Sequence, residues 1–142
     1  MPQDKKLRSI PCHCINTRRA ASAITAYYDQ IMKPCKVTVN QFSLLWSLDG
    51  LGQSNVSQLA EHVGLERSTV VRNLKPLVKE GFINDSAQRN SRDRQLLVTA
   101  KGKELIAQGV PLWKKAQKDI YRLVSDEEIK VFRKVISELQ KL

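Results

Sequence analysis

The stretch from residue 56 to residue 99 decides the fold. It opens with VSQLAEHV (Val56–Val63) and continues after a glycine with RSTVVRNLKPLVKE (Arg67–Glu80). Apolar residues recur at helical spacing in both segments, and a glycine, the residue that most often ends a helix, follows each of them. Two short apolar runs come next, separated by a loop with three arginines, and the second run is LLV (Leu96–Val98). Helix, tight turn, helix and basic hairpin, in this order, predict a winged helix-turn-helix.

Helices are also predicted on both sides of this stretch. Before it, an apolar stripe predicts a helix from Thr17 to Met32, and Thr38, with Gln41 as its capping-box partner, predicts the start of a buried central helix. Asp49–Gly52 is predicted to be a turn, and the cap of the helix that follows is Ser54 or Asn55. After it, Thr99 caps a long helix, and the capping box Ser125–Glu128 opens a last one.

The predicted fold is therefore mostly α with a small β-hairpin wing. We expect residues 1–142 to form a single domain, with the winged helix-turn-helix core at 37–99 and dimerisation helices at 11–34 and 100–142. The flanking helices have apolar stripes outside the winged core, and such a stripe needs a partner. Two-fold dimers are the commonest assembly, so we expect a homodimer.

Composition favours a polyanionic partner. The 142 residues include 24 Lys and Arg against 14 Asp and Glu, a formal net charge of +10. Nucleic acid is the first candidate partner for such a surplus, and a membrane surface is the second. The chain shows no secretory signal and no apolar run of membrane-spanning length, so we expect a cytoplasmic protein with reduced cysteines and no membrane partner.

The helix from Arg67 to Glu80 is predicted to read DNA. One side carries the valines and leucines that anchor it to the core, and the other presents short hydroxyls and cations. Serine and threonine can bond base edges or phosphates, and arginine can bind guanine with two parallel hydrogen bonds. The DNA-binding residues predicted here are Ser68, Thr69, Arg72, Asn73 and Lys75. The alternative is an ordinary solvated face.

The predicted wing, Asp85 to Arg94, adds three arginines. Arginine on a hairpin suits the minor groove, where narrow A·T-rich stretches concentrate negative potential. Arg92 is the residue expected to insert, and Arg89 and Arg94 are expected to contact phosphates or support the hairpin. The predicted partner is double-stranded DNA, read as a palindromic operator with two half-sites.

The chain resembles the MarR family of bacterial transcriptional regulators over essentially its whole length. The resemblance implies a homodimer that represses its target promoter and is released by a small molecule or an oxidant. One departure lies in the wing, where the family's Asp-Arg-Arg corresponds to Asn90-Ser91-Arg92, which leaves Asp93 as a substitute brace. The matching segments are Leu59-Ala60, Gly64-Leu65, Ser68-Thr69-Val70, Arg72-Asn73-Leu74, Gly81-Phe82-Ile83 and Leu97-Val98-Thr99-Ala100-Lys101-Gly102.

The motif Pro11-Cys12-His13-Cys14 is a candidate sensor. Thiols beside a helix N-terminus and basic side chains favour the thiolate, which reacts with oxidants. A subgroup of these regulators is similar, with Cys-x-Cys before an Arg-Arg-Ala-Ala helix. One interpretation is redox sensing by Cys12 or Cys14 with a resolving thiol on the other subunit. The others are a metal site of Cys12, His13 and Cys14, and small buried residues that pack a helix start.

Other signals and functions stay open. In this family a small aromatic ligand lies between the DNA-binding and dimerisation parts, and Tyr27, Trp46 and Trp113 are either its lining or plain core. No nucleophile–base motif or glycine-rich phosphate loop is present, so we expect no enzyme and no cofactor. The alternative functions are a weak thiol-dependent enzyme and a winged helix that binds protein instead of DNA.

Overall fold

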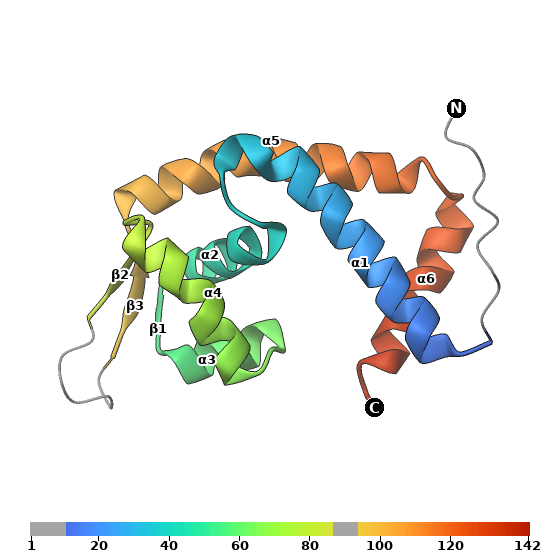
Figure 1. The fold of residues 1–142 in the computed structure, drawn as a ribbon, viewed down its shortest axis with the longest axis horizontal. Coiled ribbons are helices and arrows are strands. Elements are labelled where there is room, and N and C mark those ends of the chain that lie inside the picture. Colours follow the sequence, from blue (N-terminus) through green and yellow to red (C-terminus); the bar gives the residue numbers. More distant parts are fainter. Residues whose placement is uncertain (1–10, 87–93) are drawn as a thin grey trace.

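The computed structural model describes residues 11–86 and 94–142. Within them the chain is mostly helical with one small antiparallel sheet, as the sequence predicts (Figure 1). The elements in chain order are α1 (His13–Met32), the 3₁₀ helix η1 (Lys33–Cys35), α2 (Val39–Leu51), β1 (Gln53–Ser54), α3 (Val56–Val63), α4 (Arg67–Lys79), β2 (Ile83–Asp85), β3 (Leu96–Val98), α5 (Ala100–Tyr121) and α6 (Asp126–Leu139).

Side-chain caps explain where several helices begin. Thr38, Asn55 and Ser125 each accept a hydrogen bond from the backbone N–H three residues later, and the side chain at that later position bonds back to the cap residue. These reciprocal bonds satisfy backbone donors that a helix start leaves without partners. The capping boxes predicted at Thr38 and Ser125 are confirmed, and Asn55 caps α3.

Two predicted boundaries are wrong. Helix α1 begins at His13 instead of Thr17, so its first turn contains Cys14. Helix α2 continues through the predicted turn to Leu51, because the chain reverses at Gly52, where φ is +79°. Such a φ favours glycine, whereas Gly50 keeps a helical conformation.

The predicted hairpin is present, and a third strand joins it. Strand β3 pairs with β2 on one side and with the two-residue strand β1 on the other. In this register Ser54 lies opposite Leu96, and Ile83 lies opposite Val98. A two-residue strand has no detectable alternation, so its pairing with β3 could not be predicted from the local pattern.

The core surrounds α2. Phe42, Leu44, Leu45 and Leu48 of α2 are all buried, which confirms its prediction as a central helix. Burial of so much apolar surface stabilises the core at roughly 25 cal/mol per Å². The side chains that enclose α2 include Leu59, Val70, Leu74, Leu77, Ile83, Leu96, Val98, Leu105 and Ile106.

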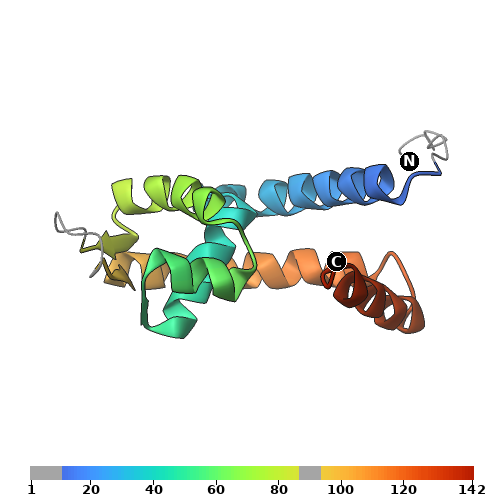
Figure 2. The same ribbon diagram turned by 90° about the horizontal axis from the view of Figure 1, so that it is seen from below.

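A helical arm extends from this core. Figure 2 shows α1, the second half of α5 and α6 projecting together to one side of α2, α3 and α4. In α6, Ile129 is buried, whereas Phe132, Val135 and Leu139 are exposed. None of the helices in the described ranges is both long and apolar enough to cross a membrane.

Candidate nucleic-acid interface

Helix α4 divides into a buried side and an exposed side. Val70, Leu74 and Leu77 are buried and fix the helix against the core. Ser68, Arg72 and Lys75 lie on the other side and, with two further residues, line one shallow hollow in the surface. The structure therefore brings together most of the α4 residues predicted to contact DNA.

The predicted polar residues differ in how free they are. An Arg72 guanidinium nitrogen lies 3.4 Å from the Thr69 hydroxyl oxygen, and both side chains lie at the surface. The Asn73 amide nitrogen instead donates to the backbone carbonyl of Thr69 at 2.9 Å, in a partly buried position. Arg72 and Thr69 therefore lie next to each other at the surface, whereas the Asn73 side chain is bonded to the backbone of its own helix.

Two residues of the hollow were missed by the sequence prediction. Arg67 and Val71 line it beside Ser68, Arg72 and Lys75. Their spacing carries a signal, because residues 67, 71 and 75 are four apart and share one helix face. Arg67 adds a cation at the start of the helix, and half-buried Val71 adds an apolar group of the kind that contacts a thymine methyl group.

The start of α4 is suited to an anion. Glu66 occupies the N-cap position but makes no side-chain cap bond within the described chain, and no acidic residue lies in the first turn. The first backbone N–H groups of a helix have no intrahelical acceptor, and the helix dipole adds partial positive charge there. Phosphate groups bind readily at such positions.

At the base of the wing, Arg94 is ion-paired. Its guanidinium donates to the Asp85 carboxylate across the hairpin with N–O distances of 2.9, 3.0 and 2.5 Å. These hydrogen bonds and the charge of Asp85 raise the pKa of Arg94 above its ordinary value. Next to the pair, the Ser86 hydroxyl accepts from the Gln95 backbone N–H at 3.0 Å. This geometry supports the second of the two roles expected for Arg94, that of holding the hairpin.

The other predicted wing residues, Arg89 and Arg92, lie outside the described residues, as do Asn90 and Asp93. The structure describes the two strands on either side of them. Strands β2 and β3 pair from Ile83–Val98 to Asp85–Leu96, so the hairpin stem is in place.

The turn after α4 is joined to the start of α5. The Thr99 hydroxyl donates to the Gly81 carbonyl at 2.6 Å and accepts from the Gly102 backbone N–H at 3.1 Å. The Lys101 ammonium group donates to the carbonyl of Glu80 at 2.6 Å. Helix α4, the wing and α5 are thereby connected through a few short polar contacts.

The candidate sensor thiols lie at the far end of the arm. Cys12 is the N-cap residue of α1, Cys14 lies in its first turn, and both are exposed in this chain, whereas Cys35 is buried. The interpretation of Cys12 and Cys14 as small buried residues is therefore not what this chain shows. No group of three His, Cys, Asp or Glu side chains is placed to hold a metal in the part of the chain that the structure describes.

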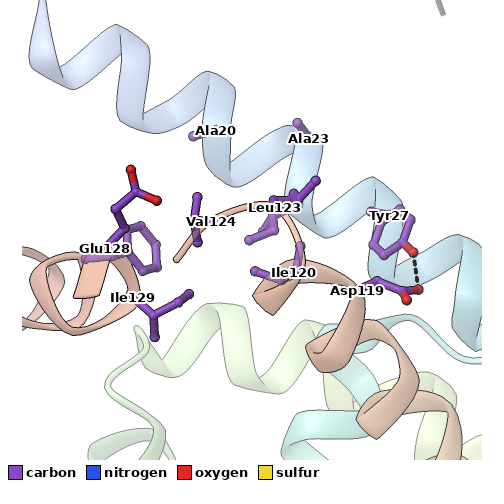
Figure 3. A pocket seen from close by; sticks show the side chains of 11 residues that line it. Ala20, Ala23, Tyr27, Asp119, Ile120, Leu123, Val124, Glu128 and Ile129 are labelled. Atoms are coloured by element: carbon purple, nitrogen blue, oxygen red, sulfur yellow. Dashed lines mark hydrogen bonds between the residues drawn. The ribbon is translucent and has the colours of Figure 1, made fainter. Parts of the chain in front are cut away.

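The three aromatic residues considered for a ligand fall into two environments. Trp46 and Trp113 pack edge to face with ring centroids 5.2 Å apart, and Trp46 also contacts Phe42, whose ring centroid is 5.5 Å away. Tyr27 instead lines a mostly apolar groove of about 580 Å³ between α1, the end of α5 and α6 (Figure 3). The groove is lined by Ala20, Ala23, Ile24, Tyr27, Asp119, Ile120, Leu123, Val124, Glu128, Ile129 and Phe132.

Comparisons with known proteins agree with this architecture. A profile of the MarR family matches residues 37–94. The transcriptional regulator MosR of M. tuberculosis, solved in complex with DNA, is 33% identical, and the match covers 92% of this chain and 94% of that chain with a TM-score of 0.79.

Two more distant structures share the fold. BpsR of Bordetella bronchiseptica, whose DNA binding is regulated by 6-hydroxynicotinic acid, is 17% identical, with coverages of 92% and 94% and a TM-score of 0.82. A MarR mutant from E. coli in complex with operator DNA is 14% identical, with coverages of 87% and 89% and a TM-score of 0.77. The winged core and the identity with MosR over nearly the full length show that this chain belongs to the MarR family of DNA-binding transcriptional regulators.

Proposed function

We propose that this chain is a homodimeric repressor that binds a palindromic operator through α4 and the wing. The observation that carries the proposal is the face of α4, where Arg67, Ser68, Val71, Arg72 and Lys75 share one hollow. A helix of this kind enters the major groove with its N-terminal residues against the base edges. The DNA complex of MosR, a relative with 33% identity, supports the same use here.

We infer the roles within this interface from the geometry of α4 and the sequence of the wing. Arg72 and Thr69 act as the base-reading pair, because Arg72 is exposed and its guanidinium lies 3.4 Å from the hydroxyl of half-buried Thr69. Arg67, Lys75 and the first backbone N–H groups of α4 bind phosphates, which fixes the register without reading sequence. Arg92 makes the minor-groove contact, and Arg89 contacts a phosphate or supports the hairpin, as the wing sequence predicts.

The arm provides the surface to which the second subunit binds. Its exposed apolar residues include Ile24, Val131, Phe132, Val135 and Leu139, and water is a poor solvent for such a surface. We assign dimerisation to residues 11–34 and 100–142 and DNA binding to residues 37–99. Sedimentation should show a species of twice the 16.1 kDa of one chain, and a 16.1 kDa species at micromolar concentration would refute the dimer.

DNA binding is tested by selecting duplexes from a random pool and measuring affinity by fluorescence anisotropy. Arg72→Ala should weaken binding to the selected duplex by about 1–3 kcal/mol and relax the base preference of the protein. The matched control is Lys114→Ala, which removes an exposed cation from α5 instead of α4. A wild-type protein that enriches no duplex would refute the function. If Arg72→Ala binds as the wild type does, the assignment of α4 as the reading helix is wrong.

We propose an oxidant as the signal, because Cys12 and Cys14 are exposed where α1 begins. A thiolate attacks hydrogen peroxide, which leaves a sulfenic acid and water. A thiol of the second subunit then displaces a second water and forms the disulfide, so two electrons reduce one peroxide. A disulfide at this place would shift α1, and the separation of the two α4 helices would then no longer match that of the half-sites.

Operator binding before and after mild peroxide, and again after thiol reduction, tests this signal. The wild type should lose binding reversibly, and a Cys12→Ser, Cys14→Ser double variant should keep it. Cys35→Ala is the control, since that thiol is buried and should not contribute to the response. If the wild type and the double variant respond alike, the thiols are not the sensor, and a small aromatic ligand becomes the expected signal.

A regulator of this family acts where the genome is, so we propose a cytoplasmic location. We also propose that the chain is not an enzyme. Membership of a family of transcriptional regulators supports both statements.

A further inference from the structure

Within the arm, α1 is attached to α5 by a cluster of polar contacts. The Tyr27 hydroxyl of α1 donates to the Asp119 carboxylate of α5 at 2.5 Å (Figure 3), and the Tyr28 hydroxyl donates to the Gln117 side-chain oxygen. We call these four residues the clasp. Asp119 is held in turn by Lys115, whose ammonium nitrogen is 2.8 Å from it.

The α1 residues of the clasp lie in the C-terminal half of that helix. Tyr28 is only 8% exposed and Met32 is fully buried, so this end of α1 is packed into the protein. From residue 13 to residue 24, by contrast, every side chain of α1 is exposed in this chain. The orientation of that exposed part depends on how α1 is held where it joins α5.

Helix α5 itself is a rigid extension of the winged core. A Cβ added to Gly102 would overlap the Phe82 carbonyl, and one added to Gly109 would overlap the Phe42 ring. Two such close approaches leave α5 little freedom to tilt against the core. A rotation of α1 relative to α5 is therefore also a rotation relative to the recognition helix.

The length of α1 amplifies a small rotation. At 1.5 Å per residue, the distance along the helix from Tyr27 to His13 is about 21 Å. A tilt of about 10° at the clasp would move the far end by about 4 Å, close to the ~3.4 Å rise of one DNA base pair. A small change of angle at the clasp is thus large enough to change the preferred half-site spacing by about one base pair.

We propose that the clasp residues Tyr27, Tyr28, Gln117 and Asp119 are positioning residues that set the half-site spacing the dimer selects. The inference rests on the proposed function, because it requires a dimer on a palindrome. The clasp touches no DNA; it fixes the angle between α1 and α5, and α5 continues into the winged core. Two subunits repeat the same angle, so its effect on the separation of the two α4 helices is doubled.

The sharpest variant is Tyr27→Phe. It removes the hydroxyl group and keeps the ring that lines the groove, while Asp119 keeps Lys115 and, at 3.6 Å, Arg122 as partners. Asp119→Ala removes the acceptor, and Asp119→Asn restores an oxygen that the Tyr27 hydroxyl can reach. Tyr121→Phe is the matched control, because it removes a hydroxyl that bonds Arg133 of α6 instead of joining α1 to α5.

The experiment uses a duplex selected by the wild type from a random pool, re-synthesised with one central base pair added or removed, and a duplex with a single half-site. The wild type and Tyr121→Phe should prefer the original spacing by about tenfold or more. In Tyr27→Phe and Asp119→Ala this preference should fall to about threefold or less, with single-half-site affinity within about twofold of wild type. Asp119→Asn should recover part of the preference.

Spacing preference separates positioning from general stability. A variant that was merely less stable would lose affinity for the single half-site as well, and that result would overturn the inference. So would an unchanged spacing preference in Tyr27→Phe and Asp119→Ala while the wild type binds its duplex well. If the wild type itself selects no duplex, the proposed function fails, and the inference fails with it.

Discussion

The Asp85–Arg94 pair decides whether Arg94 is a wing support or a DNA contact. The informative perturbation is the double variant Asp85→Ala, Arg94→Ala, which removes one charge of each sign. If the pair is a support, the charge presented to DNA is unchanged. If Arg94 instead binds a phosphate, one contact is lost in each subunit.

The stability effects follow from the exposure of the two side chains. Asp85 is 10% exposed and Arg94 is 31% exposed. Arg94→Ala alone leaves the nearly buried Asp85 carboxylate without its partner, so it should lower the free energy of unfolding by about 3 kcal/mol. Asp85→Ala leaves a more exposed guanidinium and should cost about 1–2 kcal/mol. The double variant strands no charge and should cost about 1 kcal/mol.

Urea denaturation measures these differences, and DNA titrations between about 50 and 200 mM salt measure the charge effect. For the double variant, the slope of log affinity against log salt concentration should equal that of wild type. A slope shallower by about 0.9 for each lost phosphate contact, or about 1.8 for a dimer, would refute the role of Arg94 as a support. A double variant less stable than Arg94→Ala would refute the argument from exposure.

Two further predictions concern the wing and the packing of α5. Arg92→Ala should weaken binding to all duplexes evenly and make the salt dependence shallower, because its predicted role is minor-groove charge; unchanged affinity and slope would remove it from the interface. Gly102→Ala should lower the free energy of unfolding by about 1–3 kcal/mol, because its Cβ would meet the Phe82 carbonyl. Gly50→Ala, with nothing within 4 Å of the new Cβ, should instead stabilise α2 by up to about 1 kcal/mol, and equal effects on thermal unfolding at the two glycines would contradict the packing argument.

Local sequence determined the helices of the core and the reading face. The capping boxes at Thr38 and Ser125 and the glycines after α3 and α4 act within a few residues of their own positions, so the pattern alone predicts them. The division of α4 into a buried and an exposed side follows from the period of 3.6 residues per turn. These features need no knowledge of the rest of the chain.

Tertiary structure decided what depends on contacts between distant residues. Strand β1 exists because β3 offers it backbone partners more than 40 residues away, and Arg94 is held because the hairpin brings the Asp85 carboxylate within hydrogen-bonding distance of it. The clasp joins Tyr27 to Asp119, 92 positions apart. A periodic pattern specifies which face of a helix is apolar, but not which helix meets it or at what angle. The reading helix could therefore be predicted from the sequence, whereas the contacts that orient it emerge only when the chain has folded.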